Sequence, residues 1–267
     1  MALGYSSEGV ERIAPLVPEF LQLEFPAETE GEENFKNFIA ALEVSLSNND
    51  VAALVTEPGI ITGWGSTLTA YLGFLKAVRE LTKKYGTLLI IDEVGTGFGR
   101  TGKLFAIEHE NIVPDMIVLA KGISNGAAAI GTVVGNSDLF QSTFPYVNLI
   151  STFGWTPVAC AAALKTLEIH EREKTWDQAK TKGDYIMQKL KEHVGSSITE
   201  LRGQGMEIGI VLKDAETAKK VIDTAFKKGL HIVIGSENNL QIMPPLTIPQ
   251  ELLDKGLEIL VSALSDL

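Results

Sequence analysis

Short apolar runs, each ending in a charged residue, constrain the fold of this chain more than any other feature of its sequence. The runs are Val51–Thr56, Thr87–Ile91 and Met116–Ala120, and the residues that follow them are Glu57, Asp92 and Lys121. Each run has the length of a buried strand, and helical patterns lie between them. Apolar strands that alternate with helices predict an α/β fold, in which a mostly parallel sheet carries helices on both faces.

The segment from about Ser66 to Tyr85 carries a helical pattern between the first two runs. Its apolar residues recur at three- and four-residue steps, and they are Leu68, Leu72, Leu75, Val78 and Leu81. This spacing predicts one apolar helix face. Lys83 and Lys84 in the last turn, with Gly86 just beyond, are typical of a helix C-terminus.

The pattern changes after the middle of the chain. Pro157 is suited to the first turn of a helix, and a second helix is expected over 176–194. From Ile198 onward, a strand pair, a helix over 215–228, two short strands and a last helix from Pro249 predict a small C-terminal α+β domain. We therefore expect a large domain over 1–165, followed by linking helices and the small domain over 166–267.

Composition excludes several classes of function. The net charge of −11 argues against a nucleic-acid partner, which requires a basic face, and against an anionic membrane surface. The apolar runs fall far short of the roughly 20 residues that a spanning helix needs. The single cysteine excludes an internal disulfide framework, and the four histidines lack metal-ligand spacing. We expect a cytoplasmic protein with no metal site.

The charges at the strand ends are the candidate functional residues. In an open parallel sheet, ligands bind outside the carboxyl ends of the strands, so Glu57, Asp92 and Lys121 can face one crevice. A single charge in such a place often only solvates a loop. An aspartate and a lysine on successive strands instead fit a pyridoxal phosphate site, in which the lysine forms a Schiff base and the carboxylate keeps the pyridine nitrogen protonated.

A second motif points to a different cofactor and is rejected. Gly97–Gly102 matches the glycine pattern of dinucleotide-binding loops and follows a strand. That fingerprint requires a helix that starts inside it and an acidic residue at the end of the next strand. Here the next strand ends at Lys121, so we do not expect a nicotinamide cofactor.

Several separate motifs together resemble one family. They are Ile91–Ala106 (IDEVGTGFGRTGKLFA), Pro114–Ile117 (PDMI), Leu119–Gly122 (LAKG), Ser151–Leu164 (STFGWTPVACAAAL) and Leu240–Leu260 (LQIMPPLTIPQELLDKGLEIL). In this order and spacing, they resemble the class III aminotransferases, pyridoxal phosphate enzymes of fold type I. The resemblance covers nearly the whole chain.

The resemblance implies a role for four residues. Lys121 would be the catalytic Schiff-base lysine, Asp92 would pair with the pyridine nitrogen, and Val94 would pack behind the cofactor ring. Thr152 would contact the cofactor phosphate of a neighbouring subunit, which implies a dimer with shared sites. The implied reaction transfers an amino group from an amine or ω-amino acid to a 2-oxo acid.

The chain departs from the family pattern at several points. Gly95 stands where the family usually has a glutamine that binds the ring hydroxyl, and Gln241 stands where it usually has an arginine that binds a substrate carboxylate. Trp155 replaces a small or polar residue and either shapes the site or simply packs.

The opening of the chain resembles a stretch well inside the family's large domain. We therefore expect 1–165 to be a partial cofactor-binding domain, in a homodimer or paired with a chain that supplies the N-terminal segment. The alternative is a catalytically inactive or incomplete fragment that keeps the fold and needs a partner chain for activity.

Overall fold

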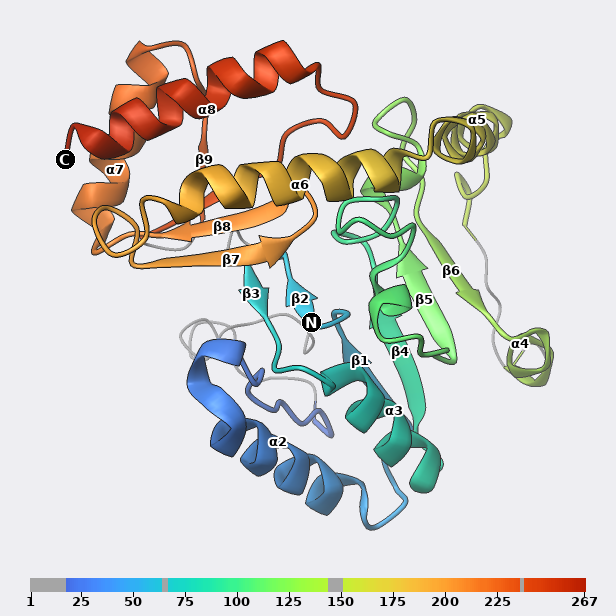
Figure 1. Cartoon of the computed structure of the whole chain (residues 1–267). Coiled ribbons are helices and arrows are strands. Elements are labelled where there is room, and N and C mark those ends of the chain that lie inside the picture. The colour runs from blue at the N-terminus through green and yellow to red at the C-terminus, as the bar shows by residue number, and fades with distance from the viewer. Residues whose placement is uncertain (1–17, 64–66, 144–150, 236–237) are drawn as a thin grey trace.

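A computed structural model describes residues 18–63, 67–143, 151–235 and 238–267, and within these ranges two four-stranded sheets organise the molecule (Figure 1). The first sheet contains β1 (Ala53–Thr56), β4 (Leu88–Asp92), β5 (Met116–Leu119) and β6 (Thr132–Gly135), in the order β1-β4-β5-β6. The strands β1, β4 and β5 are parallel and confirm the three predicted runs. The edge strand β6 pairs antiparallel with β5 and was not predicted.

Two helices cover one face of the first sheet. The chain enters through the short 3₁₀ helix η1 (Glu28–Glu30), continues as α2 (Gly31–Leu46), and returns later as α3 (Phe74–Lys84). Side chains of α2, α3 and β4 form a common core that includes Leu42, Phe74, Val78, Leu89 and Ile91. On the opposite face of β1, Val55 is 40% exposed, so that face is less completely buried than the face under α2 and α3.

The start of α3 differs from the prediction. Leu68 lies in β3 (Leu68–Thr69), which pairs with β2 (Ile60–Ile61), and Leu72 is 87% exposed. Gly73, with a φ of 87°, precedes the first helical residue, and this left-handed conformation interrupts the helical spacing. The predicted start near Ser66 is therefore wrong. The predicted apolar face is confirmed only within α3, where Leu75, Val78 and Leu81 are buried.

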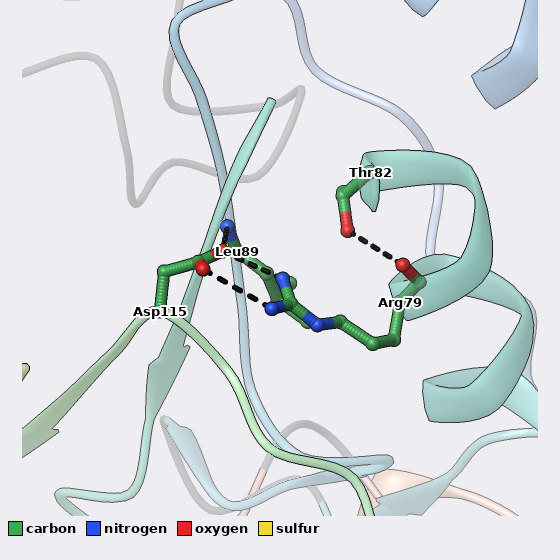
Figure 2. Close-up of polar contacts among 4 residues, drawn as sticks. All are labelled: Arg79, Thr82, Leu89 and Asp115. Atoms are coloured by element: carbon green, nitrogen blue, oxygen red, sulfur yellow. Dashed lines mark hydrogen bonds and ion pairs between the residues drawn. The ribbon is translucent and has the colours of Figure 1, made fainter. Parts of the chain in front are cut away.

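An ion pair fastens α3 to the sheet (Figure 2). The guanidinium of Arg79 donates to both carboxylate oxygens of Asp115, over 2.6 and 3.1 Å, and the backbone N–H of Leu89 donates to Asp115 Oδ2 over 2.7 Å. Burial opposes ionisation of Asp115, but these hydrogen bonds outweigh it and hold the pKa of Asp115 below its usual value. The pair lies at the N-terminal side of β4 and β5, away from their carboxyl ends.

The second sheet is antiparallel and has helices on one face. It contains β7 (Glu200–Gln204), β8 (Glu207–Val211), β10 (Asn239–Ile242) and β9 (Val233–Ile234), in the order β7-β8-β10-β9. The helices are α6 (Thr175–Lys191), α7 (Ala215–Lys227) and α8 (Gln250–Ser265). Ile208, Ile210 and Leu240 face these helices in a fully buried core. This α+β arrangement agrees with the prediction.

The two sheets meet through β2 and β3. These short strands lie directly beneath β7 and β8, on the side of the second sheet that faces away from α6 (Figure 1). The connection between the sheets runs through α4 (Ser137–Thr143) and α5 (Pro157–Glu173), with Pro157 in the first turn as predicted. No helix within the described ranges is both long and apolar enough to cross a membrane.

Candidate functional site

The three strand-end charges gather at the carboxyl edge of the first sheet. Asp92 is the last residue of β4 and lies opposite Val118 of β5. Lys121 opens the 3₁₀ helix η4 (Lys121–Ile123) directly after β5, and Glu57 follows β1. The charges of Asp92 and Lys121 both act on the Glu57 carboxyl group. The structure therefore brings together the three residues that the parallel topology predicted at one edge.

Lys121 is held in an unusual backbone conformation, and its amine is unpaired among the described residues. Its φ is +43°, in the left-handed region that costs a non-glycine residue free energy. The residue is exposed, and its Nζ makes no hydrogen bond or ion pair with the described residues. Behind it, a Cβ on Gly122 would lie 3.1 Å from the Phe98 side chain, so η4 packs closely on the loop after β4. A rigid turn thus presents an amine that is available for chemistry.

Asp92 is oriented by the turn that follows it. The backbone N–H of Val94 donates to Asp92 Oδ1 over 2.9 Å, which fixes the carboxylate against the start of the turn. Both Asp92 and Val94 are half-buried. The bond uses one carboxylate oxygen, so Oδ2 is left as an acceptor for a ligand.

Thr62 occupies the space beside Gly95. The Glu57 Oε2 atom accepts hydrogen bonds from the Thr62 backbone N–H at 2.9 Å and from Thr62 Oγ1 at 3.2 Å. A Cβ on Gly95 would lie only 1.9 Å from that same Oγ1. Residue 95 is therefore a glycine because the Thr62 side chain fills the space that a larger residue would need. Sequence reasoning missed Thr62, which carries no motif of its own.

Burial controls the protonation of Glu57. Desolvation raises the pKa of Glu57 above its ordinary value, and the nearby Asp92 charge acts in the same direction. The hydrogen bonds from Thr62 and the charge of Lys121 oppose this shift without cancelling it. Glu57 therefore holds a proton more readily than a solvated glutamate does.

A second carboxylate lies where the second sheet meets the first. Glu207, at the start of β8, is completely buried, and its Oε1 accepts from Gln241 Nε2 at 2.7 Å and from Thr67 Oγ1 at 2.9 Å. Gln241 Nε2 also reaches the Thr62 carbonyl oxygen at 3.4 Å. Gln241 thus binds a carboxylate of its own chain and links Glu207 to the Thr62–Glu57 pair.

Sequence reasoning also missed Glu207, although a signal was present. Along β8 the residues Ile208 and Ile210 point to the apolar core, so the alternate position of Glu207 faces the other side of the sheet. A charged residue at the start of an otherwise apolar strand is a candidate for a polar contact between two sheets. We call this contact, formed by Glu207, Gln241, Thr67 and Thr62, the seam.

Arg100 joins the glycine-rich loop to the second sheet. Its Nη1 donates to the carbonyl oxygens of Met206 at 3.1 Å and Pro244 at 2.7 Å. Residues 97–101 form turns, and no helix begins inside the Gly97–Gly102 motif; the next helical segment is the 3₁₀ helix η3 (Ala106–His109). Burial lowers the pKa of Arg100, although the charge of Glu207 opposes this effect. The motif therefore serves as a contact between the two sheets.

Thr152 and Trp155 lie elsewhere on the surface. Both are in the exposed turn that precedes α5, where Trp155 is 78% exposed. Within the described ranges, no hydrogen bond joins Thr152 to Asp92, Val94 or Lys121. Three of the four predicted site residues thus come from the carboxyl edge of one sheet, and Thr152 comes from a separate exposed turn.

Known proteins provide independent information on this arrangement. The sequence profile of the family described as aminotransferase class-III matches residues 1–264. The structure is similar to an ornithine aminotransferase from Toxoplasma gondii, with 30% identity and a TM-score of 0.80 over 85% of this chain and 54% of that one. It is also similar to an acetylornithine aminotransferase from Elizabethkingia anophelis, with 33% identity and a TM-score of 0.80 over 86% of this chain and 58% of that one.

An (S)-enantioselective omega-transaminase from Thermomicrobium roseum is similar as well. The identity is 31% and the TM-score 0.83, over 96% of this chain and 62% of that one. This chain thus spans between 54% and 62% of the length of these three solved structures.

Proposed function

This chain belongs to the class III aminotransferase family, and from that premise we propose that it acts in pyridoxal-phosphate-dependent transfer of an amino group from an amine or ω-amino acid to a 2-oxo acid. Enzymes of this family use pyridoxal phosphate. The observation that carries the proposal is the free amine of Lys121 at the end of β5, beside the oriented carboxylate of Asp92 at the end of β4.

The residues at this edge fit the reactive half of the cofactor. Lys121 Nζ is unpaired among the described residues, as a covalent attachment point must be, and Asp92 Oδ2 is available to accept from a ring N–H. Val94, half-buried in the turn after Asp92, would pack behind the ring. Thr62 Oγ1 stands where the side chain of residue 95 would otherwise lie, and so it places a hydroxyl group beside Gly95.

Each of these residues has a separate chemical task. When bound, pyridoxal phosphate supplies an electron sink for the carbon next to the reacting nitrogen. The negative charge of Asp92 would hold a proton on the ring nitrogen and so preserve that sink. Lys121 Nζ would hold the cofactor and, as a free amine, would accept and return the proton of the substrate carbon.

We further propose that the site is completed by a second chain, with Thr152 reaching the cofactor phosphate of a neighbour. Phe153, Trp155 and Val158, beside Thr152, are 85%, 78% and 73% exposed. Adjoining apolar side chains exposed to this degree are typical of a protein interface. Light scattering is expected to show a dimer at micromolar concentration, and a clean monomer would contradict the proposal.

The same proposal divides the chain at residue 165. Residues 1–165 hold the strand-end charges, and residues 166–267 supply the linking helices and the small domain. A single cysteine and a strongly negative net charge support a cytoplasmic protein that works on small molecules rather than on nucleic acids or membranes.

The test of the proposed function is covalent attachment of pyridoxal phosphate to Lys121. The purified chain is titrated with the cofactor while the visible absorption is followed, then reduced with borohydride and mapped by peptide mass spectrometry. We expect the label on Lys121, its loss in Lys121→Ala, and its retention in the control Lys103→Ala, which alters an exposed lysine of the preceding loop. A label on another lysine, or none, would overturn the assignment.

A further inference from the structure

One oxygen atom of the Glu207 carboxylate lacks a partner among the residues that the structure describes. Its Oε1 accepts from Gln241 and Thr67, but its Oε2 has no hydrogen-bond partner within those residues, although Glu207 is completely buried. A buried carboxylate oxygen that lacks a donor costs free energy, so native proteins rarely leave one without a use. For the ionised carboxylate the missing partner is a hydrogen-bond donor, and a positively charged donor satisfies it best.

A second acceptor without a donor lies nearby. Asn239, on β10, is 4% exposed, and its Oδ1 has no hydrogen-bond partner in the described ranges. A Cβ on Gly209 would lie 3.1 Å from this atom and 2.7 Å from the Cβ of Thr67, so Asn239 Oδ1 flanks the residue that donates to Glu207. The layer around Thr67 therefore holds unsatisfied acceptors from two neighbouring strands.

The cations near Glu207 are already committed. Arg100 and Lys121 are the cations whose charges act on Glu207. Arg100 Nη1 donates to two backbone carbonyl oxygens, and Lys121 is reserved for the cofactor under the proposed function. Within the described part of the chain, neither cation forms a hydrogen bond to Glu207 Oε2.

Carboxylates and hydrogen bonds connect Glu207 to the strand-end charges. Gln241 bonds both Glu207 and the Thr62 carbonyl oxygen, and Thr62 bonds Glu57. The charges of Asp92 and Lys121 reach Glu57 in turn. The region between the two sheets is thus rich in acceptors and negative charge, which favours a cationic group over an anionic one.

We propose that Glu207, held in place by Gln241 and Thr67, binds the second ammonium group of a diamine substrate and thereby determines which amines this protein accepts. The inference rests on the proposed function, because it assigns the far end of the substrate whose near end reacts at Lys121. It predicts that diamines bind in preference to ω-amino acids, whose far end is a carboxylate.

Binding must open the seam, since Glu207 is closed off by residues from both sheets. Thr67 comes from the segment before β3 and Glu207 from β8, so a ligand would have to separate these two elements to reach the carboxylate. Burial raises the pKa of Glu207 in the closed structure. An arriving ammonium group favours the ionised carboxylate, so binding is expected to release a proton at any pH at which Glu207 is protonated in the closed protein.

The experiment compares ligands that differ only at the far end. Binding of 1,4-diaminobutane, 4-aminobutyrate and butylamine is measured by isothermal titration calorimetry in two buffers of different ionisation enthalpy. We expect 1,4-diaminobutane to bind about tenfold to a hundredfold more tightly than butylamine, the range for a charge-assisted hydrogen bond, and 4-aminobutyrate to bind no better than butylamine.

Two substitutions assign the effect to Glu207. Glu207→Gln keeps the shape and the Oε1 acceptor but removes the charge, and it should abolish the preference for the diamine together with the proton release. Gln241→Arg should neutralise Glu207 and likewise reduce the preference. Glu258→Gln, an exposed position on α8, removes an equal charge and should leave the preference unchanged. Circular dichroism and thermal melting confirm that each variant folds.

The outcomes separate this inference from the proposed function. Titrations are run on the chain without cofactor and, where Lys121 becomes labelled, on the borohydride-reduced adduct. A diamine preference that depends on Glu207 in either form supports the inference. Equal binding of diamine and monoamine in both forms, no measurable binding, or a preference that survives Glu207→Gln overturns it, whereas the proposed function is judged by the Lys121 label alone.

Discussion

The two sheets differ in how completely their own helices cover them. In the second sheet, Ile208, Ile210 and Leu240 are fully buried beneath three helices. In the first sheet, Val133 and Val134 of the edge strand β6 remain 48% and 51% exposed. The edge strand of the second sheet is equally exposed, since Val233 and Ile234 of β9 are 52% and 47% exposed. The sheets differ at their central strands, because all residues but one are buried in β8 and in β10, whereas more than half of the residues in β4 and in β5 are only partly buried. The second sheet therefore has the more closed core.

Because of this difference, we expect the second sheet to contribute mainly to stability and the first sheet to carry the reactive residues. The charged groups proposed for the reaction, Asp92 and Lys121, lie at the carboxyl edge of the first sheet, which we call the open sheet, where a ligand can reach them. The covered sheet contributes through its other face, which presents Glu207 and Gln241 to the seam. Substitutions in the two sheets should therefore affect different properties of the protein.

The largest effect is expected on turnover when Asp92, at the end of β4, loses its negative charge. Asp92→Asn should keep pyridoxal phosphate bound but lower kcat on the order of a thousandfold, because a neutral amide cannot keep the ring nitrogen protonated; comparable losses follow removal of one electrostatic stabiliser in other enzymes. The stability of the variant should stay close to that of the parent protein. Steady-state kinetics and urea unfolding measure both, in any assembly that shows activity.

A control substitution distinguishes the loss of the Asp92 charge from the loss of any one negative charge of the protein. Asp50→Asn removes an exposed aspartate from the turn after α2 and should change neither turnover nor stability. Turnover by Asp92→Asn at the parent rate would show that Asp92 does not set the electronics of the cofactor.

The next effect concerns stability and compares a core position of the second sheet with an edge position of the first. Ile210→Ala removes a fully buried side chain from the second sheet and should cost about 2–5 kcal/mol of unfolding free energy. Val134→Ala, at 51% exposure on the edge of the first sheet, should cost less than about 1 kcal/mol. Urea titrations followed by circular dichroism give both values, and equal costs would mean that Val134 is covered in the working protein.

A smaller effect is expected where Thr62 packs against Gly95. Gly95→Ala places a Cβ 1.9 Å from Thr62 Oγ1, so Thr62 must rotate and lose its side-chain bond to Glu57, at a cost of about 1–3 kcal/mol. Thr62→Gly removes the obstructing atoms. In a double-mutant cycle, Gly95→Ala should then cost less in the Thr62→Gly background than in the parent protein. Additive costs would place Thr62 away from residue 95.

Much of the open sheet could be predicted from the sequence because its signals are local. Continuous apolar runs marked β1, β4 and β5, and parallel topology then placed Glu57, Asp92 and Lys121 at one edge. Where local patterns mislead, prediction fails. Leu68 and Leu72 follow helical spacing by chance, although Leu68 lies in β3 and Leu72 is exposed.

The seam could not be predicted because its partners are distant in sequence. Gln241 lies 34 residues from Glu207, and Thr67 lies 140 residues from it. Nor did any signal in the sequence indicate that the Thr62 side chain fills the space beside Gly95. Such contacts depend on how the β2–β3 segment folds back under the second sheet, and no periodicity records that.

The smallest effect is expected where the two sheets meet, and it depends on pH. Burial raises the pKa of Glu207 above 4.5, against the opposing bonds from Gln241 and Thr67, so between 4.5 and the raised value the folded state binds more protons than the unfolded state. The stability of the parent protein should therefore fall as the pH rises through this window. Glu207→Gln cannot ionise and avoids that loss.

We expect the stability of Glu207→Gln relative to the parent protein to increase as the pH rises from 4.5 toward 7, because only the parent protein loses the contribution of the raised Glu207 pKa. Glu57 and Glu93 also have raised pKa values, but both proteins retain them, so they cancel in the difference. Urea unfolding from pH 4 to 8 measures the difference, with Glu258→Gln as the exposed control. If the relative stability of Glu207→Gln instead fell as the pH rose, the ionised carboxylate would be stabilised in the seam, and a cation already present in the protein would satisfy Oε2.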